Sequence, residues 1–295
     1  MKAAWLLLAA GCLALPLFAG ENAPAGSKVG KTSVYQPQKY ALSQRADIFN
    51  SKNKYGFIIL QSKPAGGNPP RTQFWMAAAQ TGFCPLVNFL KITVNDIPNS
   101  VIDPKIDDFI AWKDQNLAGC EAKFNFDGVK LILRFYMRPD SPVLWGSLRP
   151  APDSMEKIRK IELNFCALVS KLAMKNKKVL WSGVYDREAV TPVRTLTQRQ
   201  KIWELTPQDT WIVLQDRKFD GSSEEKGTGP VMILLDHAGI AKAELALRNK
   251  WTTSLSVVLK PDFKEFKFGL WQQETRISNA GFAEKLKAEK AAFSR

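Results

Sequence analysis

The chain has 295 residues, of which 45% are hydrophobic and 24% are charged, so it can bury a large core and is not a disordered chain. Its net charge is +14, and it contains one histidine, His237. A single histidine excludes His-rich zinc sites, two-histidine acid/base pairs and the H-E-x-x-H metalloprotease motif. We therefore expect no metal site and no cofactor.

The first predicted element is a signal peptide over residues 1–19. Lys2 provides a positive start, residues 3–18 form an apolar run, and Ala19 is a small residue at a plausible cleavage point. The run is shorter than the roughly 20 residues of a membrane span, and no later stretch approaches that length. We expect an exported bacterial protein, periplasmic or secreted, without a transmembrane segment after cleavage. Lipoprotein anchoring through Cys12 is the alternative.

Residues 20–50 are poor in apolar residues and contain several prolines and glycines, which predicts a linker or an irregular N-terminal segment. From residue 51 onward, short apolar or alternating runs follow one another. The predicted strands are 55–61, 85–94, 107–112, 121–126, 129–137, 142–148, 158–165, 178–185, 210–216, 230–236, 241–248, 253–260 and 264–272.

The strongest local signal is a hairpin around Asp127-Gly128. On its first side, Phe124 and Phe126 alternate with polar residues, and on its second side Leu131, Leu133 and Phe135 share one face. Two alternating runs joined by Asp-Gly are typical of a tight β-hairpin, because both turn residues must adopt positive φ.

The spacing of these runs predicts a mostly β fold, a large antiparallel β-sandwich over residues 51–279. Residues 170–178 could form one or two helical turns. In residues 280–295, Phe282, Leu286 and Phe293 fall near one helical face, which predicts a short C-terminal amphipathic helix. We expect this helix to cover an edge or a face of a sheet.

Three cysteines remain after signal cleavage, Cys84, Cys120 and Cys166. Their spacing matches no metal motif. An oxidising compartment would permit one disulfide with one thiol left over, and buried thiols that behave as small apolar side chains are the open alternative.

Candidate catalytic residues are few. His237 ends an apolar run and follows Asp236, and a histidine could act as a general base if a carboxylate oriented it. Neighbours on a strand point to opposite faces, however, so this pair is a weak candidate. A loop histidine with a structural role is the simpler interpretation.

The nine tryptophans of the chain are more informative than its single histidine, because aromatic rings bury large areas and stack on flat apolar faces. We select Trp112 and Trp211, which lie at the ends of predicted strands, as candidate ligand-binding residues. Arg134 and Lys130 share the polar face of one strand and complete the candidate set. The basic net charge favours an acidic partner, either an acidic polysaccharide or an envelope lipid. No motif for nucleic-acid binding accompanies it.

The segment LILRFYMRPDSPVLWGSLRP, followed by IRKIELNF, resembles part of the bacterial galactose-mutarotase-like β-supersandwich domains, as do the later runs GPVMILLD and FKFGLW. The resemblance implies a carbohydrate-associated fold. Mutarotases open the sugar ring with two histidines and a glutamate, and a chain with only His237 departs from that pattern. No catalytic residue is carried over.

Together these patterns predict an exported, non-catalytic carbohydrate-binding or cell-envelope protein, with anionic glycans as the expected ligands. Two alternatives stay open. One is a carbohydrate-active enzyme on the same fold, an epimerase, lyase or hydrolase. The other is a structural or protein-interaction module of the envelope.

Overall fold

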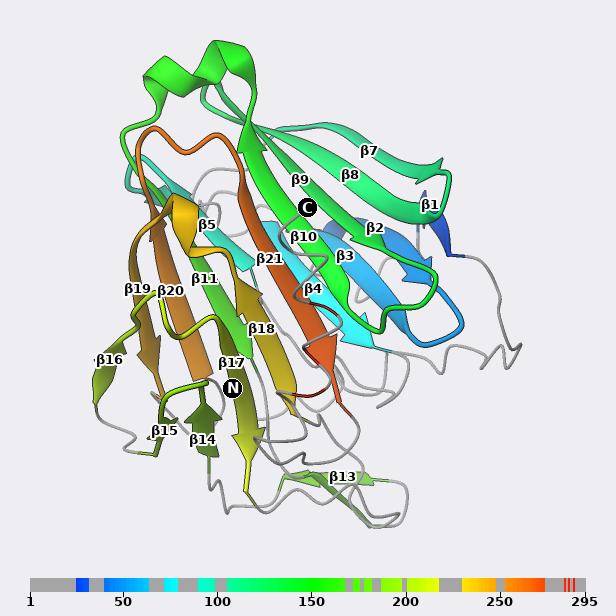
Figure 1. The fold of residues 1–295 in the computed structure, drawn as a ribbon. Helices are drawn as coiled ribbons and strands as arrows, with labels where there is room; N and C mark the ends of the chain where they lie inside the picture. The colour runs from blue at the N-terminus through cyan, green and yellow to red at the C-terminus, as the bar shows by residue number, and fades with distance from the viewer. Residues whose placement is uncertain are drawn as a thin grey trace.

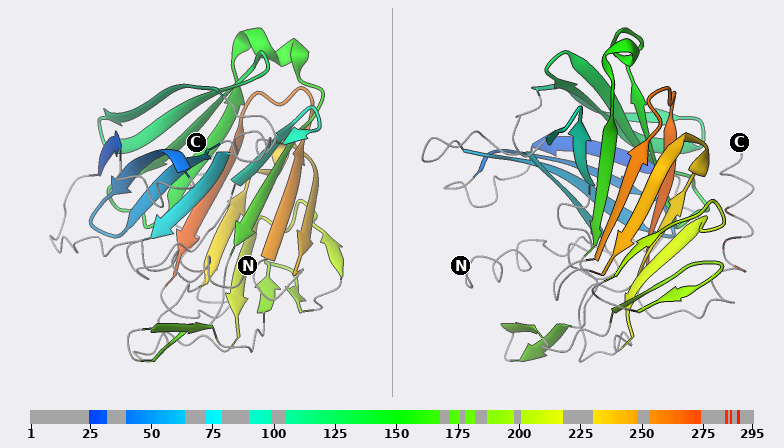
Figure 2. Two further views of the ribbon diagram at one scale, coloured as in Figure 1. Left: turned by 180° about the vertical axis from the view of Figure 1, so that it is seen from behind. Right: turned by 90° about the vertical axis from the view of Figure 1, so that its left-hand side faces the viewer.

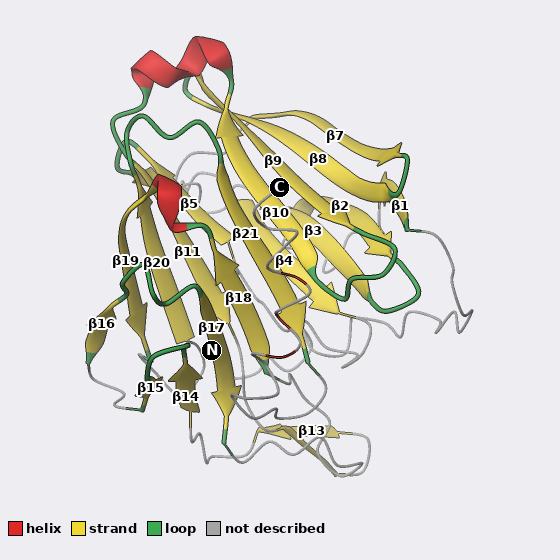
Figure 3. Cartoon of the chain, in the orientation of Figure 1, coloured by secondary structure: helices red, strands yellow, loops and turns green. Residues whose placement is uncertain are grey.

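The structure is a computed structural model, and it describes residues 25–31, 40–63, 72–78, 90–98, 105–167, 172–175, 178–181, 187–197, 201–217, 230–247 and 253–273, together with residues 284, 286 and 289. Antiparallel strands dominate it (Figure 1). Short 3-10 helices, η1 (Pro152–Lys157) and η2 (His237–Gly239), interrupt the strands (Figure 3). The predicted mostly β sandwich is confirmed.

One layer of the sandwich is a nine-stranded sheet of order β15-β14-β17-β18-β21-β10-β9-β8-β7. Its strands are, in chain order, β7 (Lys105–Asp114), β8 (Leu117–Phe126), β9 (Val129–Met137), β10 (Leu144–Pro150), β14 (Arg187–Val190), β15 (Thr195–Leu196), β17 (Trp211–Asp216), β18 (Val231–Leu235) and β21 (Phe266–Gln272). β21 inserts between β10 and β18, so the last described strand joins the two halves of the sheet.

The opposite layer consists of two sheets, which Figure 2 shows from two further sides. The four-stranded sheet contains β1 (Gly26–Lys31), β2 (Tyr40–Phe49), β3 (Lys54–Ser62) and β4 (Thr72–Ala78) in chain order. The six-stranded sheet has the order β16-β19-β20-β11-β5-β6, with β5 (Leu90–Val94), β6 (Ile97–Pro98), β11 (Ile161–Ala167), β16 (Ile202–Glu204), β19 (Ile240–Ala246) and β20 (Thr253–Leu259). A separate hairpin pairs β12 (Leu172–Lys175) with β13 (Lys178–Trp181).

Phenylalanines join the layers. Phe57 of the four-stranded sheet lies 4.8 Å from Phe135 of the nine-stranded sheet, measured between ring centroids. Phe165 of the six-stranded sheet lies 5.2 Å from Phe268 of β21. Both smaller sheets therefore pack on the same inner face of the nine-stranded sheet, and one core runs through the sandwich.

The predicted hairpin is confirmed. Asp127 and Gly128 have φ of 52° and 85°, and Phe126 pairs with Val129 across the two-residue turn. Positive φ at both positions is what such a turn requires. The burial pattern of β9 alternates along its whole length, as the sequence pattern indicates.

Two expectations need correction. Residues 20–50 do not form only an irregular segment, because β1 and β2 lie there and β2 pairs with β3 over its whole length. β1 lacks large apolar residues at alternate positions, and in β2 the polar Gln44 interrupts the alternation between Leu42 and Ile48. Pairing to a good strand supplies what the local pattern does not. Residues 172–175 form strand β12 rather than a helical turn, since they pair with residues 178–181.

The structure answers in part whether two of the three cysteines form a disulfide. Cys120 is buried in the core, and no disulfide joins it to Cys166. Burial raises the pKa of the Cys120 thiol, so the thiol stays protonated and unreactive. Cys84 lies outside the described residues.

Candidate functional site

The outer face of the nine-stranded sheet, opposite the core, carries a line of aromatic side chains. Strand pairing brings residues of seven strands into register along this line, which we name the aromatic row. Its members, in order across the sheet, are Trp112, Gly119, Tyr136, Trp145, Gly269, Leu234 and Trp211. Neighbouring strands lie about 4.8 Å apart, so the six steps of the row span roughly 29 Å.

Two glycines make this row possible. A Cβ atom at Gly269 would lie only 2.6 Å from Leu234 Cδ1 and 3.2 Å from Trp145 Cζ3. A Cβ atom at Gly119 would lie 2.9 Å from Trp112 Cζ2. The large side chains therefore lie directly over the glycine backbone, and adjacent rings can approach one another across a missing side chain.

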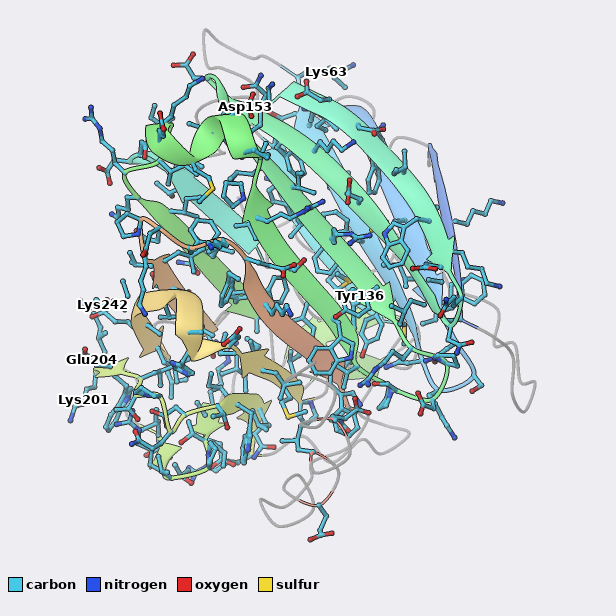
Figure 4. The ribbon with its side chains drawn as sticks, turned by 45° about the horizontal axis from the view of Figure 1, so that its top comes forward. Lys63, Tyr136, Asp153, Lys201, Glu204 and Lys242 are labelled. Atoms are coloured by element: carbon cyan, nitrogen blue, oxygen red, sulfur yellow. The ribbon has the colours of Figure 1, made fainter. Side chains whose placement is uncertain are left out.

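The row has an open end and a covered end. Trp112 and Tyr136 are half-buried, and their ring centroids lie 6.3 Å apart. Trp145 and Trp211 are each only 4% exposed. They belong to a second apolar cluster on this face, which also contains Trp271 of β21 and Leu286 of the C-terminal segment. Figure 4 shows Tyr136 on the face of the sheet.

A guanidinium group lies on the open end. The Arg134 guanidinium carbon is 4.5 Å from the centroid of the Trp112 ring, and Arg134 Nε is 3.1 Å from Glu121 Oε2. Cations over an indole face are attracted by its quadrupole, and the ion pair fixes the guanidinium plane. Trp112 and Arg134, two of the predicted ligand-binding residues, are thus brought into direct contact.

Further charges surround this pair. Lys123 and Arg149 lie 3.8 Å and 3.9 Å from the Glu121 carboxylate, and Lys123 also pairs with Asp108. Three basic side chains, Arg134 included, therefore face two carboxylates. The open end carries a small positive excess beside an aromatic surface.

Tyr136 lies between the charged and the aromatic parts of the row. Burial raises the pKa of its phenol above the ordinary value, while the nearby Arg138 lowers this pKa in part. The hydroxyl group therefore stays protonated at neutral pH and can both donate and accept a hydrogen bond.

Lys130, another predicted binding residue, shares the outer face of β9 with Arg134 but lies at the other end of the strand. Its ammonium group is exposed and pairs with Asp153 of η1 at 2.9 Å, and this hydrogen bond raises the pKa of Lys130. Figure 4 shows Asp153 well away from Tyr136. The structure does not bring Lys130 into the aromatic row.

Trp211 lies at the covered end of the row rather than on the surface. Its ring is packed in the second apolar cluster with Val213 and Leu234. Trp112 and Trp211 thus mark the two ends of one row, although only Trp112 is open in this structure.

His237 and Asp236 take structural positions around η2. The Asp236 carboxylate caps η2 by accepting from the Ala238 backbone N–H at 3.0 Å. His237 Nε2 lies 3.2 Å from the backbone carbonyl oxygen of Asp209, an atom that can only accept a hydrogen bond. Among the contacts of the described residues, none joins the His237 ring to the Asp236 carboxylate.

The neighbouring Asp209 anchors this corner of the fold. Its side chain is fully buried, and Oδ2 accepts from Arg194 Nη2 and from the Thr206 backbone N–H, both at 2.8 Å. Burial by itself would raise the pKa of Asp209, but the hydrogen bonds from Thr206, Thr191 and Arg194 outweigh it, and the net pKa is lowered.

We expect Asp209→Asn to lower the free energy of unfolding by about 2 kcal/mol at pH 7, because charge-assisted hydrogen bonds to a buried carboxylate are lost. A lowered folded-state pKa stabilises the protein fully above the unfolded-state pKa of about 3.9, and this contribution is lost as the pH falls through the folded-state value. Urea denaturation of both proteins at a series of pH values measures this. The difference between them should shrink below about pH 4, and a difference that stays constant would contradict the assignment.

Sequence reasoning did not select Tyr136, Trp145 or Trp271 as site residues. Strand alternation does place Tyr136 on the same face as Arg134, two residues away. Trp145 and Trp271 could not have been placed, because their position depends on how β10 and β21 pair.

Within the described residues, no group of His, Cys, Asp and Glu side chains could hold a metal ion. Over the same part of the chain, every helix is too short or too polar to cross a membrane.

No family model matches this sequence, and no curated protein matches it. Among solved structures, the alpha-N-acetylgalactosaminidase of Bifidobacterium bifidum is similar, with a TM-score of 0.51 and 7% identity over 92% of this chain and 38% of that chain. The GH36 alpha-galactosidase of Geobacillus stearothermophilus in complex with stachyose has a TM-score of 0.41 and 9% identity, over 78% of this chain and 41% of that one. The alpha-galactosidase of Lactobacillus brevis has a TM-score of 0.40 and 9% identity, over 79% of this chain and 39% of that one.

The chain spans about two fifths of the length of these solved proteins. At such low identity, the likeness to the Bifidobacterium protein shows the fold alone. That fold is a large antiparallel β-sandwich.

Proposed function

We propose that the protein is an exported, non-catalytic carbohydrate-binding protein of the bacterial envelope, with a galactose-mutarotase-like sandwich as its scaffold. The observation that carries this proposal is the open end of the aromatic row. There, the partly exposed rings of Trp112 and Tyr136 lie beside the Arg134 guanidinium on the sheet.

Binding follows from the chemistry of these groups. The flat apolar face of a pyranose ring can stack on Trp112, and the Tyr136 hydroxyl group can exchange hydrogen bonds with sugar hydroxyls. Arg134 presents a fork of N–H donors that matches a carboxylate. The small positive excess around Glu121 and the net charge of +14 favour a glycan with carboxylate groups. We therefore name polyuronates as the expected ligand class.

The proposed export to the periplasm or the medium rests on the predicted signal peptide at residues 1–19 and its apolar run. Envelope and extracellular glycans are accessible there. Expression of the full chain in a bacterium, followed by mass determination of the product, tests this part. A mature form that begins at residue 20 supports export with cleavage, and an unprocessed cytoplasmic form contradicts it.

The binding test compares wild type, Trp112→Ala and Arg134→Gln by isothermal titration with oligogalacturonate. We expect Trp112→Ala to weaken binding by at least about tenfold, because truncation of an aromatic anchor commonly costs this much or more. Arg134→Gln should weaken binding of oligogalacturonate but not of its methyl-esterified form. Added salt should likewise weaken the binding of oligogalacturonate but not the binding of its methyl-esterified form, because salt screens the attraction between the carboxylates and Arg134.

Trp203→Ala is the matched control. Trp203 is also half-buried, and Lys201 lies 4.2 Å from its ring centroid, but it belongs to β16 of the other layer. Figure 4 shows Lys201 far from Tyr136. Equal losses for Trp112→Ala and Trp203→Ala would contradict the site. Absence of binding to both forms of the glycan would overturn the proposed function.

A further inference from the structure

The covered end of the aromatic row is closed by the C-terminal segment, of which the structure describes three helical residues, 284, 286 and 289. Leu286 is fully buried against the cluster that contains Trp145, Trp211 and Trp271. Three residues further along, Glu289 is also buried, whereas Glu284 is exposed. Residues three apart lie on the same side of a helix, so one helical face makes both contacts.

The Glu289 carboxylate is held by groups of the sandwich. Its Oε2 atom accepts from Arg138 Nη2 and from Ser141 Oγ, each at 2.8 Å. The Arg138 guanidinium carbon in turn lies 5.6 Å from the centroid of the Trp145 ring. A carboxylate is therefore bound here by a guanidinium and a hydroxyl at the border of an aromatic surface.

This cradle, which consists of Arg138 and Ser141, belongs to the connection between β9 and β10 and not to the C-terminal segment. Ser141 is buried in the β9–β10 connection, and its Oγ accepts from the Val143 backbone N–H at 3.1 Å. Asn50 Nδ2 donates to the Ser141 carbonyl oxygen at 2.7 Å and fixes the connection to the four-stranded sheet. Ser141 therefore stays in position when the occupant leaves, and the Trp145 ring still lies beside the Arg138 guanidinium, which is the condition for a preformed binding site.

We propose that this cradle is a second carboxylate-binding subsite, which Glu289 and Leu286 occupy in place of a ligand. The inference rests on the proposed function and extends it. A uronate residue combines a carboxylate with an apolar ring face, and Glu289 with Leu286 presents the same two chemistries to Arg138, Ser141 and the tryptophans. A polyuronate bound at Trp112 and Arg134 would continue along the row by displacing the helical segment.

Because of this competition, the apparent affinity equals the intrinsic affinity multiplied by the fraction of molecules in which the subsite is open. Removing the internal occupant should therefore strengthen binding. We expect Glu289→Gln to bind oligogalacturonate about tenfold to a hundredfold more tightly than wild type, since charge-assisted hydrogen bonds no longer hold the segment. Glu284→Gln, on the exposed side of the same segment, removes the same charge outside the cradle and is the matched control, so it should gain much less affinity than Glu289→Gln.

A second variant and a second readout separate release of the segment from unfolding. Leu286→Ser in the full chain should raise the acrylamide quenching of tryptophan fluorescence, because Trp145, Trp211 and Trp271 become accessible. It should also strengthen binding, while thermal denaturation still shows one folded protein. In the double variant Arg138→Gln with Glu289→Gln, the gain in affinity should disappear, because the cradle itself is lost.

The outcomes distinguish this inference from the proposed function. If wild type binds oligogalacturonate through Trp112 but neither Glu289→Gln nor Leu286→Ser binds more tightly, the subsite is refuted and the proposed function stands. If increased quenching shows release of the segment and no variant binds the glycan, both are overturned. A gain in Glu289→Gln that survives the added Arg138→Gln change would also refute the subsite.

Discussion

Phe268→Ala is expected to lower the free energy of unfolding by about 3–5 kcal/mol, the usual cost of deleting a phenylalanine from a core. The Phe268 ring is fully buried and lies edge-on to Phe135 at 5.9 Å and to Phe165 at 5.2 Å. It therefore contacts the nine-stranded sheet and the six-stranded sheet at once. Chemical denaturation monitored by circular dichroism measures the loss.

Phe49→Ala is the control for this prediction. Phe49 is 37% exposed at the end of β2, so its removal should cost about 1 kcal/mol or less. Similar losses for the two variants would mean that Phe268 does not join the layers. A large loss confined to Phe268→Ala would support one continuous core.

The fold was predictable where a local pattern agrees with the final pairing. Asp127-Gly128 specifies its own turn, and Leu131, Leu133 and Phe135 of β9 have to face the core together. Such segments make the fold class predictable, because apolar residues at every second position indicate a strand with one buried face.

Strands stabilised mainly by their neighbours were not predictable. β1 has the sequence GSKVGK, with no alternating apolar face, and it forms because β2 offers a complete set of hydrogen-bond partners. The same holds for β12, whose sequence LAMK suits a helix as well as a strand. Tertiary pairing decides in both segments.

The site was predictable only in fragments. Trp112 and Arg134 could be selected singly, and the Asp127-Gly128 hairpin predicts that β8 pairs with β9. Nothing in the sequence indicates that β7 pairs with β8 in the register that places Trp112 opposite Gly119. The covered end is harder still, because β21 is far from β10 in the chain and pairs with it directly. A row that crosses seven strands depends on which strands pair and on the exact register of each pair, whereas alternation fixes only the face on which a residue lies.

Gly119→Ala is expected to lower the free energy of unfolding by on the order of 3 kcal/mol, the upper part of the range for overpacking in a buried site. A Cβ atom there would overlap the backbone carbonyl oxygen of Phe135 and would lie 2.9 Å from the Tyr136 Cα atom. Backbone atoms of a central strand cannot move aside without loss of the β8–β9 ladder. The added methyl group should therefore separate two strands of the nine-stranded sheet.

The same change should affect binding, which links this position to the proposed site. The new Cβ atom would also lie 2.9 Å from Trp112 Cζ2, so the indole ring would have to move away from Tyr136 and Arg134. At a temperature where the variant is still folded, we expect weaker binding of oligogalacturonate, comparable to that of Trp112→Ala.

Gly239→Ala tests whether this effect depends on the aromatic row. A Cβ atom at Gly239 would meet its nearest atom, the Glu265 carbonyl oxygen, at 3.6 Å, which is an ordinary van der Waals distance. This variant should therefore differ from wild type by less than about 1 kcal/mol and bind normally. If Gly119→Ala kept full stability and bound the glycan as wild type does, Trp112 would not lie over Gly119, and the aromatic row would lose its open end. Loss of stability with normal binding would instead mean that Gly119 is needed for the β8–β9 pairing but not for the site. The Trp112 indole ring would then keep its binding position although residue 119 carries a Cβ atom.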